Sequence, residues 1–193
     1  DLFRDYDCVG PDTIIPLPDG TRPTIKELSE KYKDSPQECF HVFSYDHETD
    51  TVKLGNAFHP RKKGLRESWK ITFDNDQSVI GSAKHPFLMR NGEYKVVKDL
   101  QVGDSVMPFE ADIIPAETRI ISIIEHIGEM DVYDVTVEQY QNFATDSCFV
   151  HNTMDMDPII ASALDIYADE TTVKSELGEL LLINSPNSEI QDI

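Results

Sequence analysis

The chain has 193 residues, of which 39% are hydrophobic and 27% charged, a composition typical of a soluble globular protein. Its net charge of −19 argues against direct nucleic-acid binding, because neutralising phosphates requires clustered Lys and Arg. No apolar run approaches the roughly 18–20 residues that a membrane span needs, and no signal peptide opens the chain. The chain does not begin with Met, and we expect an internal piece of a longer protein.

Three cysteines, Cys8, Cys39 and Cys148, make an odd number without CxxC spacing. This pattern predicts neither a disulfide framework nor a structural zinc site, and it fits a reducing cytosol. We therefore expect no cofactor and no metal. The one basic cluster, Arg61–Lys63 with Arg66, is predicted to be a solvated loop.

Residues 13–150 alternate short β-rich runs with turn residues, which predicts an all-β domain. Turns are expected at Pro18–Gly20, Asp74–Asp76 and Asn91–Gly92, and short helical pieces at Thr24–Lys33 and Val97–Leu100. The expected strands are Thr13–Ile15, His41–Tyr45, Trp69–Phe73, Ser78–Ile80, Ser105–Met107, Arg119–Ile124, Val132–Val137 and Asn142–Thr145.

Two segments, Trp69–His85 and Val132–His151, resemble each other, each reading as strand, turn, strand and then His. After Asn152 the character changes to an acidic tail, residues 153–193. There we predict a helix that begins at Pro158 and a strand over Gly178–Ile183. Residues 1–7 and 153–193 are therefore interpreted as sequence that flanks one β domain, residues 8–152.

Cys8 and Asn152 stand at the two ends of this domain. Either residue alone indicates little, since a single Cys is more often a small buried residue than a nucleophile. Removing a segment without another enzyme, however, requires both. The first residue must attack the carbonyl that precedes it, which a Cys thiol can do, and the last must cut its own carboxyl-side bond, which Asn achieves by cyclising. Thr153 offers a hydroxyl to accept the acyl group.

Proton transfer and carbonyl polarisation require further groups. His151 adjoins Asn152 and is expected to assist its cyclisation. Ser82 and His85 end the second strand of the first repeat and are expected to act at the Asp7–Cys8 bond.

Several segments in the same order resemble the splicing blocks of inteins. Asp99–Asp104 is similar to the family's Leu-x-x-Gly-Asp turn, and Ser82–His85 to its Thr-x-x-His motif with Ser in place of Thr. The others are Cys8–Thr13, Val132–Phe143, and Phe149–Asn152 with Thr153.

This resemblance implies the Hint fold, a pseudo-two-fold β horseshoe, followed here by a short α/β tail. It also implies that Asp134 supports splicing and that the domain acts, as a monomer, only on its own flanking residues Asp7 and Thr153. Too little chain separates Gly103 from Arg119 for a helical endonuclease, so a mini-intein without DNA cleavage is expected. Gln141 departs from the family, because many members have His there.

The flanks suggest a host. Asp1–Asp7 joined to Thr153–Glu170 resembles part of a portal protein of tailed bacteriophages, which implies the cytoplasm of an infected bacterium. Asp7 itself could attack the neighbouring thioester and release the N-terminal piece early.

Three alternatives remain open. An autoprocessing Hint protein of the hedgehog type would transfer the thioester to a small nucleophile and would need neither Asn152 nor Thr153. A non-catalytic β domain of a phage structural protein would leave the chain intact. A Cys-His hydrolase would act on other proteins.

Overall fold

The computed structural model describes residues 8–109 and 118–152, all within one compact unit, Asp1–Met154. Asp7, Thr153 and the predicted helix and strand of the tail lie outside the described residues. The fold is almost entirely antiparallel β, as predicted, and no helix in this part is long and apolar enough to cross a membrane. The elements are α1 (Ile25–Lys31), β1 (Phe40–Asp46), β2 (Thr51–Phe73), β3 (Ser78–Ser82), β4 (Pro86–Leu88), β5 (Tyr94–Val96), the 3₁₀ helix η1 (Val97–Asp99), β6 (Ser105–Val106), β7 (Arg119–Val137), β8 (Asn142–Ala144) and β9 (Phe149–His151).

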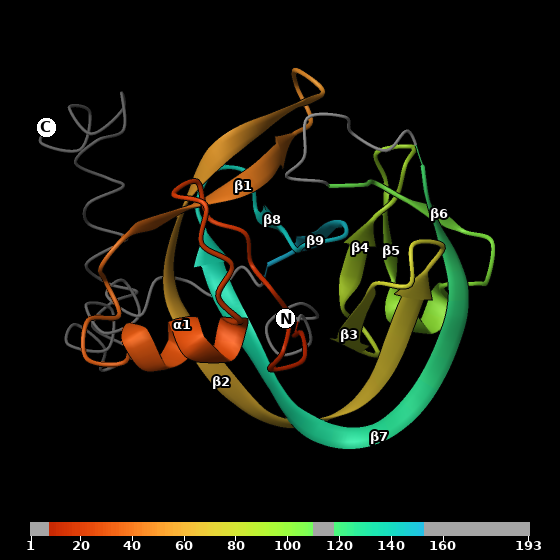
Figure 1. The fold of residues 1–193 in the computed structure, drawn as a ribbon, viewed down its shortest axis with the longest axis horizontal. Helices are drawn as coiled ribbons and strands as arrows, with labels where there is room; N and C mark the ends of the chain where they lie inside the picture. Colours follow the sequence, from red (N-terminus) through yellow and green to blue (C-terminus); the bar gives the residue numbers. More distant parts are fainter. Residues whose placement is uncertain (1–7, 110–117, 153–193) are drawn as a thin grey trace, which may run out of the picture. The chain divides into compact units, whose positions relative to one another are not determined.

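Two long strands, β2 and β7, pair along most of their length and curl together into an open half-barrel (Figure 1). Their register shifts at four places, and such bulges bend a strand and increase its twist. Gly64 and Gly128 have φ values of 95° and 84°, a region that only glycine adopts without strain, so both residues permit the bend. The β2–β7 pair forms the frame of the Hint horseshoe.

Shorter strands attach to this frame. β1 and β3 pair with opposite ends of β2, and β6 pairs with β7. A second sheet, in the order β5-β4-β9-β8, brings the last described strand against β4. The main apolar core includes Ile15, Ile71, Phe73, Phe87, Ile121 and Phe143, each at most 1% exposed. The end of the domain is therefore a paired interior strand.

The helix is shorter than predicted. Thr24 caps α1 through a capping box, in which its hydroxyl accepts from the Glu27 N–H and the Glu27 carboxylate accepts from the Thr24 N–H. The helix ends at Lys31, because Tyr32 leaves the helical region and stacks on Phe40 with ring centroids 4.7 Å apart. The second predicted piece, Val97–Leu100, is the 3₁₀ helix η1.

Several strand predictions need correction. Thr13–Ile15 contributes only a bridge between Ile14 and Thr24. Arg119–Ile124 and Val132–Val137 belong to one strand, β7, since Gly128 bends the chain without ending the ladder. The basic cluster at residues 61–63 is part of β2 and not a solvated loop, because it pairs with β7. Strands β4, β5 and β9 are additions that the sequence pattern does not predict.

Candidate functional site

The segment Cys8–Gly10 lies between β3 and β7. Val9 forms antiparallel bridges with both Gly81 and Tyr133, and it exchanges two hydrogen bonds with Tyr133, of 2.9 and 2.8 Å. In an antiparallel ladder, the residue before Val9 lies opposite the residues after Gly81 and Tyr133. Cys8 thus lies between Ser82 of β3 and Asp134 of β7, and its side chain is fully buried.

Ser82 contacts the backbone of Cys8 directly. The Cys8 N–H donates to Ser82 Oγ over 3.4 Å, and the Ser82 N–H donates to the Cys8 carbonyl over 3.0 Å. The Cys8 nitrogen belongs to the Asp7–Cys8 peptide bond, so the hydroxyl is beside the bond predicted to react. His85 closes the following turn through its N–H on the Ser82 carbonyl, at 2.9 Å. His85 is 1% exposed, and its ring stands edge-on to Phe87.

The C-terminal end of the domain is held by β8 and β4. The Asn152 N–H donates to the Gln141 carbonyl over 3.1 Å, and Asn152 is 1% exposed. Phe87 of β4 pairs with Val150 of β9. His85 directly precedes β4 and Asn152 directly follows β9, so both stand at the same end of this antiparallel pair. At position 141 it is the backbone carbonyl that contacts Asn152.

Asp134 is 1% exposed and forms an ion pair with Arg61 of β2, with Arg61 Nη2 3.0 Å from Asp134 Oδ2. The guanidinium also donates to Thr136 Oγ1 and to the His59 carbonyl. The β2–β7 register shifts on both sides of Arg61, and such bulges change the direction in which the strand and its side chains point. Sequence reasoning missed Arg61, since nothing local distinguishes it from its lysine neighbours.

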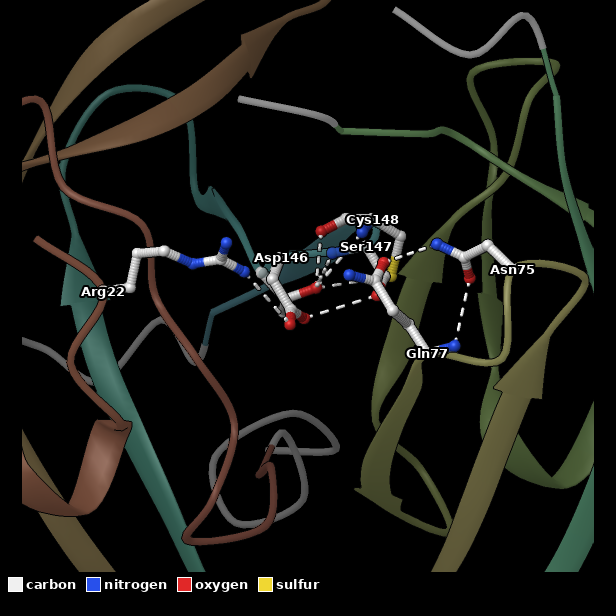
Figure 2. A network of polar contacts seen from close by, with 7 residues as sticks. Arg22, Asn75, Gln77, Asp146, Ser147 and Cys148 are labelled. Carbon is white, nitrogen blue, oxygen red and sulfur yellow. Dashed lines mark hydrogen bonds and ion pairs between the residues drawn. The ribbon is translucent and has the colours of Figure 1, made fainter. Parts of the chain in front are cut away.

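Cys148 belongs to a different environment. Figure 2 shows it on the β8–β9 turn, where Ser147 Oγ donates to Gln77 Oε1 over 2.9 Å and Asp146 faces Arg22. Complete burial raises the pKa of the Cys148 thiol to about 12, which leaves almost no thiolate at neutral pH. Cys39 is exposed, lies beside β1 and also has a raised pKa, chiefly through partial burial. Of the three cysteines, only Cys8 lies beside Ser82 and Asp134.

The arrangement places Cys8 beside Ser82 and Asp134, with His85 one turn after Ser82, and it places Asn152 directly after β9, against Gln141. It offers a thiol, a hydroxyl against a peptide nitrogen, a paired carboxylate and a buried side-chain amide. His151 lies on β9 next to Asn152, with its ring against Tyr94. Within residues 8–109 and 118–152, no three His, Cys, Asp or Glu side chains gather as metal ligands would.

Solved structures of inteins share this fold. The crystal structure of the Ssp DnaB mini-intein variant M86 matches with a TM-score of 0.68 and 19% identity, covering 79% of this chain and 99% of that one. The PabCDC21-1 intein gives a TM-score of 0.64 at 21% identity, covering 76% and 99%. The DnaX mini intein from Spirulina platensis gives 0.61 at 22% identity, covering 76% and 100%. The chain therefore has the Hint fold of the mini-inteins.

Two curated proteins also match in sequence. A DNA gyrase subunit from Synechocystis sp. is 32% identical over 116 residues, or 60% of this chain, and replicative DNA helicase DnaB from Rhodothermus marinus is 30% identical over 102 residues, or 53%. The chain spans only about a tenth of each protein's length, 11% and 10% respectively. No family model matches the sequence.

Proposed function

We propose that residues 8–152 excise themselves and join Asp7 to Thr153. The observation that carries this proposal is the burial of both ends of the domain: Cys8 is fully buried against Ser82, and Asn152 is 1% exposed. Buried thiol and amide groups that are held next to a general acid and hydrogen-bond donors react through proximity, the largest rate contribution available to a single-turnover process. No cofactor is required by this chemistry.

In the first step, Cys8 Sγ attacks the Asp7 carbonyl carbon, the C–N bond to Cys8 breaks, and a thioester forms. The leaving nitrogen is the atom that contacts Ser82 Oγ, and it must gain a proton. His85, one turn further, is the group we assign to donate that proton. Ser82 keeps the scissile nitrogen in place.

In the second step, Thr153 Oγ1 attacks the thioester and releases the Cys8 thiol, so that the acyl group becomes an ester. Asp134, whose carboxylate lies on the strand beside Cys8, is the group that we assign to assist this exchange. Asn152 Nδ2 then attacks its own carbonyl, with His151 assistance, which breaks the bond to Thr153 and forms a succinimide. An O-to-N acyl shift restores a peptide bond between Asp7 and Thr153.

The pattern of sequence matches supports an inserted, self-removing element. A gyrase subunit and a replicative helicase bear different names, yet each matches this chain over about a tenth of its length. An element that leaves its host protein intact after excision explains such matches. We further propose that the element carries no endonuclease and that its host is a portal protein of a tailed phage, in a bacterial cytoplasm.

The test is mass spectrometry of the purified chain after expression. Splicing yields residues 8–152 as one product and residues 1–7 joined to 153–193 as the other. Cys8→Ala blocks the first step and leaves only cleavage after Asn152. Asn152→Ala blocks that cleavage, so the chain stops at the thioester and the branched ester on Thr153, and an added thiol releases residues 1–7. An intact chain of unchanged mass under reducing conditions would refute the proposal and favour a non-catalytic domain.

Residue Asp7 provides a second test of the same chemistry. Its carboxylate can attack the thioester carbonyl and release the N-terminal piece as an anhydride, which water then opens. Asp7→Asn removes this nucleophile and should lower the fraction of prematurely cleaved product on a gel. Unchanged premature cleavage would exclude this route without affecting the proposed splicing.

A further inference from the structure

One face of β9 contacts aromatic side chains from other strands. We call Tyr45, Tyr94 and the His47 ring that contacts both of them the aromatic bracket. Phe149 and His151 are two residues apart on a strand, so their side chains point to the same face. The Tyr45 ring of β1 stands edge-on to Phe149 with centroids 5.8 Å apart, and the Tyr94 ring of β5 stands edge-on to His151 at 5.0 Å and 87°. Side chains from β1 and β5 thus contact β9, the strand that directly precedes Asn152.

His47 connects the two arms of this bracket. Its Nε2 lies 3.1 Å from the Tyr94 hydroxyl, and its ring contacts both Tyr45 and Tyr94, with centroids 5.2 and 5.6 Å away. The hydrogen bond holds the outer end of the Tyr94 side chain in place, and the contact of the His47 ring with the Tyr94 ring limits rotation of the ring plane. The ring plane in turn limits the orientations open to the imidazole of His151, because perpendicular aromatic pairs have a preferred geometry.

Burial raises the pKa of the Tyr94 hydroxyl, so this side chain stays a neutral hydrogen-bonding group. Tyr94 is nevertheless 37% exposed and belongs to neither apolar core cluster. Packing in an apolar core therefore does not explain why Tyr94 contacts His151. Its ring contacts are the two histidines, and its hydroxyl also has a hydrogen bond with the Asn142 side chain.

The residue at position 141 suggests why the aromatic bracket matters for the reaction at Asn152. Gln141 stands where many inteins have His, and its backbone carbonyl is what reaches Asn152. We infer that Tyr94, anchored by His47, is the positioning residue that orients His151 for cleavage after Asn152. The inference rests on the proposed function and concerns only its last bond-breaking step. Tyr94 touches no reacting atom and acts through His151.

Two parent variants separate this role from general damage, because Cys8→Ala reacts only at its C-terminal end, after Asn152, and Asn152→Ala releases its N-terminal piece only when a thiol is added. In the Cys8→Ala parent, Tyr94→Leu should slow cleavage after Asn152 by about two- to tenfold, the factor expected from one lost aromatic pair. In the Asn152→Ala parent, the same change should leave thiol-induced cleavage before Cys8 within about twofold of the parent rate. Tyr94→Phe retains the ring and should recover most of the rate, and His47→Leu should fall between the two.

Trp69→Leu is the matched control, because Trp69 is a partly buried aromatic that packs on a different imidazole, His126, at 4.8 Å. It should lower stability without a selective effect on cleavage after Asn152. In an unreactive chain carrying both Cys8→Ala and Asn152→Ala, Tyr94→Leu should also shift the ring-proton resonances of His151, since a neighbouring aromatic ring is removed.

The possible outcomes separate the role of Tyr94 from the proposed function itself. A Cys8→Ala parent that cleaves, with a Tyr94→Leu variant that cleaves at the same rate, overturns the inference alone. So does equal slowing of both single-step reactions, which would indicate structural damage. If neither parent reacts and the native chain does not splice, the proposed function fails and the inference fails with it.

Discussion

The Arg61–Asp134 ion pair makes a quantitative prediction about stability. Changing Arg61 to Met keeps most of the side-chain volume but removes the cation that lies 3.0 Å from the Asp134 carboxylate. The carboxylate would then remain 1% exposed without this counter-charge, and Thr136 Oγ1 would lose a donor. Measurements should use the unreactive chain that carries Cys8→Ala and Asn152→Ala, so that splicing does not change the molecule under study.

Breaking a buried pair by removing one partner costs about 3–5 kcal/mol, mostly because a buried charge is left uncompensated. The Arg61 side chain is 14% exposed, so water can reach one edge and we expect the lower end, about 3 kcal/mol. For a domain of this size that loss lowers the melting temperature by about 6–12 °C. Adding Asp134→Asn removes the buried negative charge of the carboxylate and should recover about 2 kcal/mol of the loss in the free energy of unfolding.

Urea unfolding of the parent, both single variants and the double variant completes the thermodynamic cycle. The expected coupling is about 3 kcal/mol, because a double variant about as stable as Asp134→Asn alone means that Arg61→Met costs nothing once the carboxylate is gone. A loss below about 1 kcal/mol for Arg61→Met would refute the reasoning, as would simple additivity of the two changes. Either result would mean that water or another cation already stabilises Asp134.

Three other predictions follow from local contacts. In the native fold iodoacetamide should label Cys39 and spare Cys148, whose thiol is fully buried with a pKa of about 12, as peptide mass spectrometry would show. Asn142→Leu should cost about 2–3 kcal/mol in urea unfolding, because its side chain makes hydrogen bonds of 2.7, 2.9 and 3.0 Å to backbone groups. Although burial raises it, the pKa of Asp104 is held below its ordinary value by hydrogen bonds from Lys95 and the Gln101 N–H. A depressed folded-state pKa stabilises the fold above the unfolded value and is lost as pH falls, so Asp104→Asn should weaken the decline in stability below about pH 4.

Each of these has a clear contrary result. Equal labelling of Cys39 and Cys148 before unfolding would show that the β8–β9 turn opens readily. A cost under about 1 kcal/mol for Asn142→Leu would mean that the backbone groups find other partners. A pH profile unchanged by Asp104→Asn would assign the acid sensitivity to other carboxylates.

The sequence predicted the fold class well, since the pattern of strands and turns is a local feature, while the two proposed ends of the segment, Cys8 and Asn152, stay a prediction. Short alternating runs separated by turn residues identify strands without knowledge of their partners, and Cys8 and Asn152 stand at composition boundaries. Most of β2 could not be predicted in the same way. Residues 51–68 carry Lys, Arg, Gly and Pro without alternation, and they form a strand because β1 pairs with residues 51–57 and β7 with residues from Ala57 onward.

The parts of the candidate site that could not be predicted depend on contacts between residues far apart in the sequence. Arg61 and Asp134 are paired across the β2–β7 ladder, and Tyr94 meets His151 through the β4–β9 pairing. Neither pairing carries a local signal, because Arg61 and Tyr94 resemble residues on solvated surfaces elsewhere in the chain. Ser82 and His85 were proposed from their place at the end of the first repeat and from a resemblance to a family motif. The hydrogen bond from the Cys8 N–H to Ser82 required the three-dimensional structure.

The position of Val9 between β3 and β7 also bears on the timing of biosynthesis. Val9 bonds to Tyr133, so the strand that holds Cys8 is completed only after β7 has been made. A growing chain already contains Cys8, Ser82 and His85 long before that point, but closing so large a loop must await its second edge. For the proposed splicing, a nascent chain that stops before Arg119 is therefore expected to keep its Asp7–Cys8 bond, so that an incomplete chain is not cut on the ribosome.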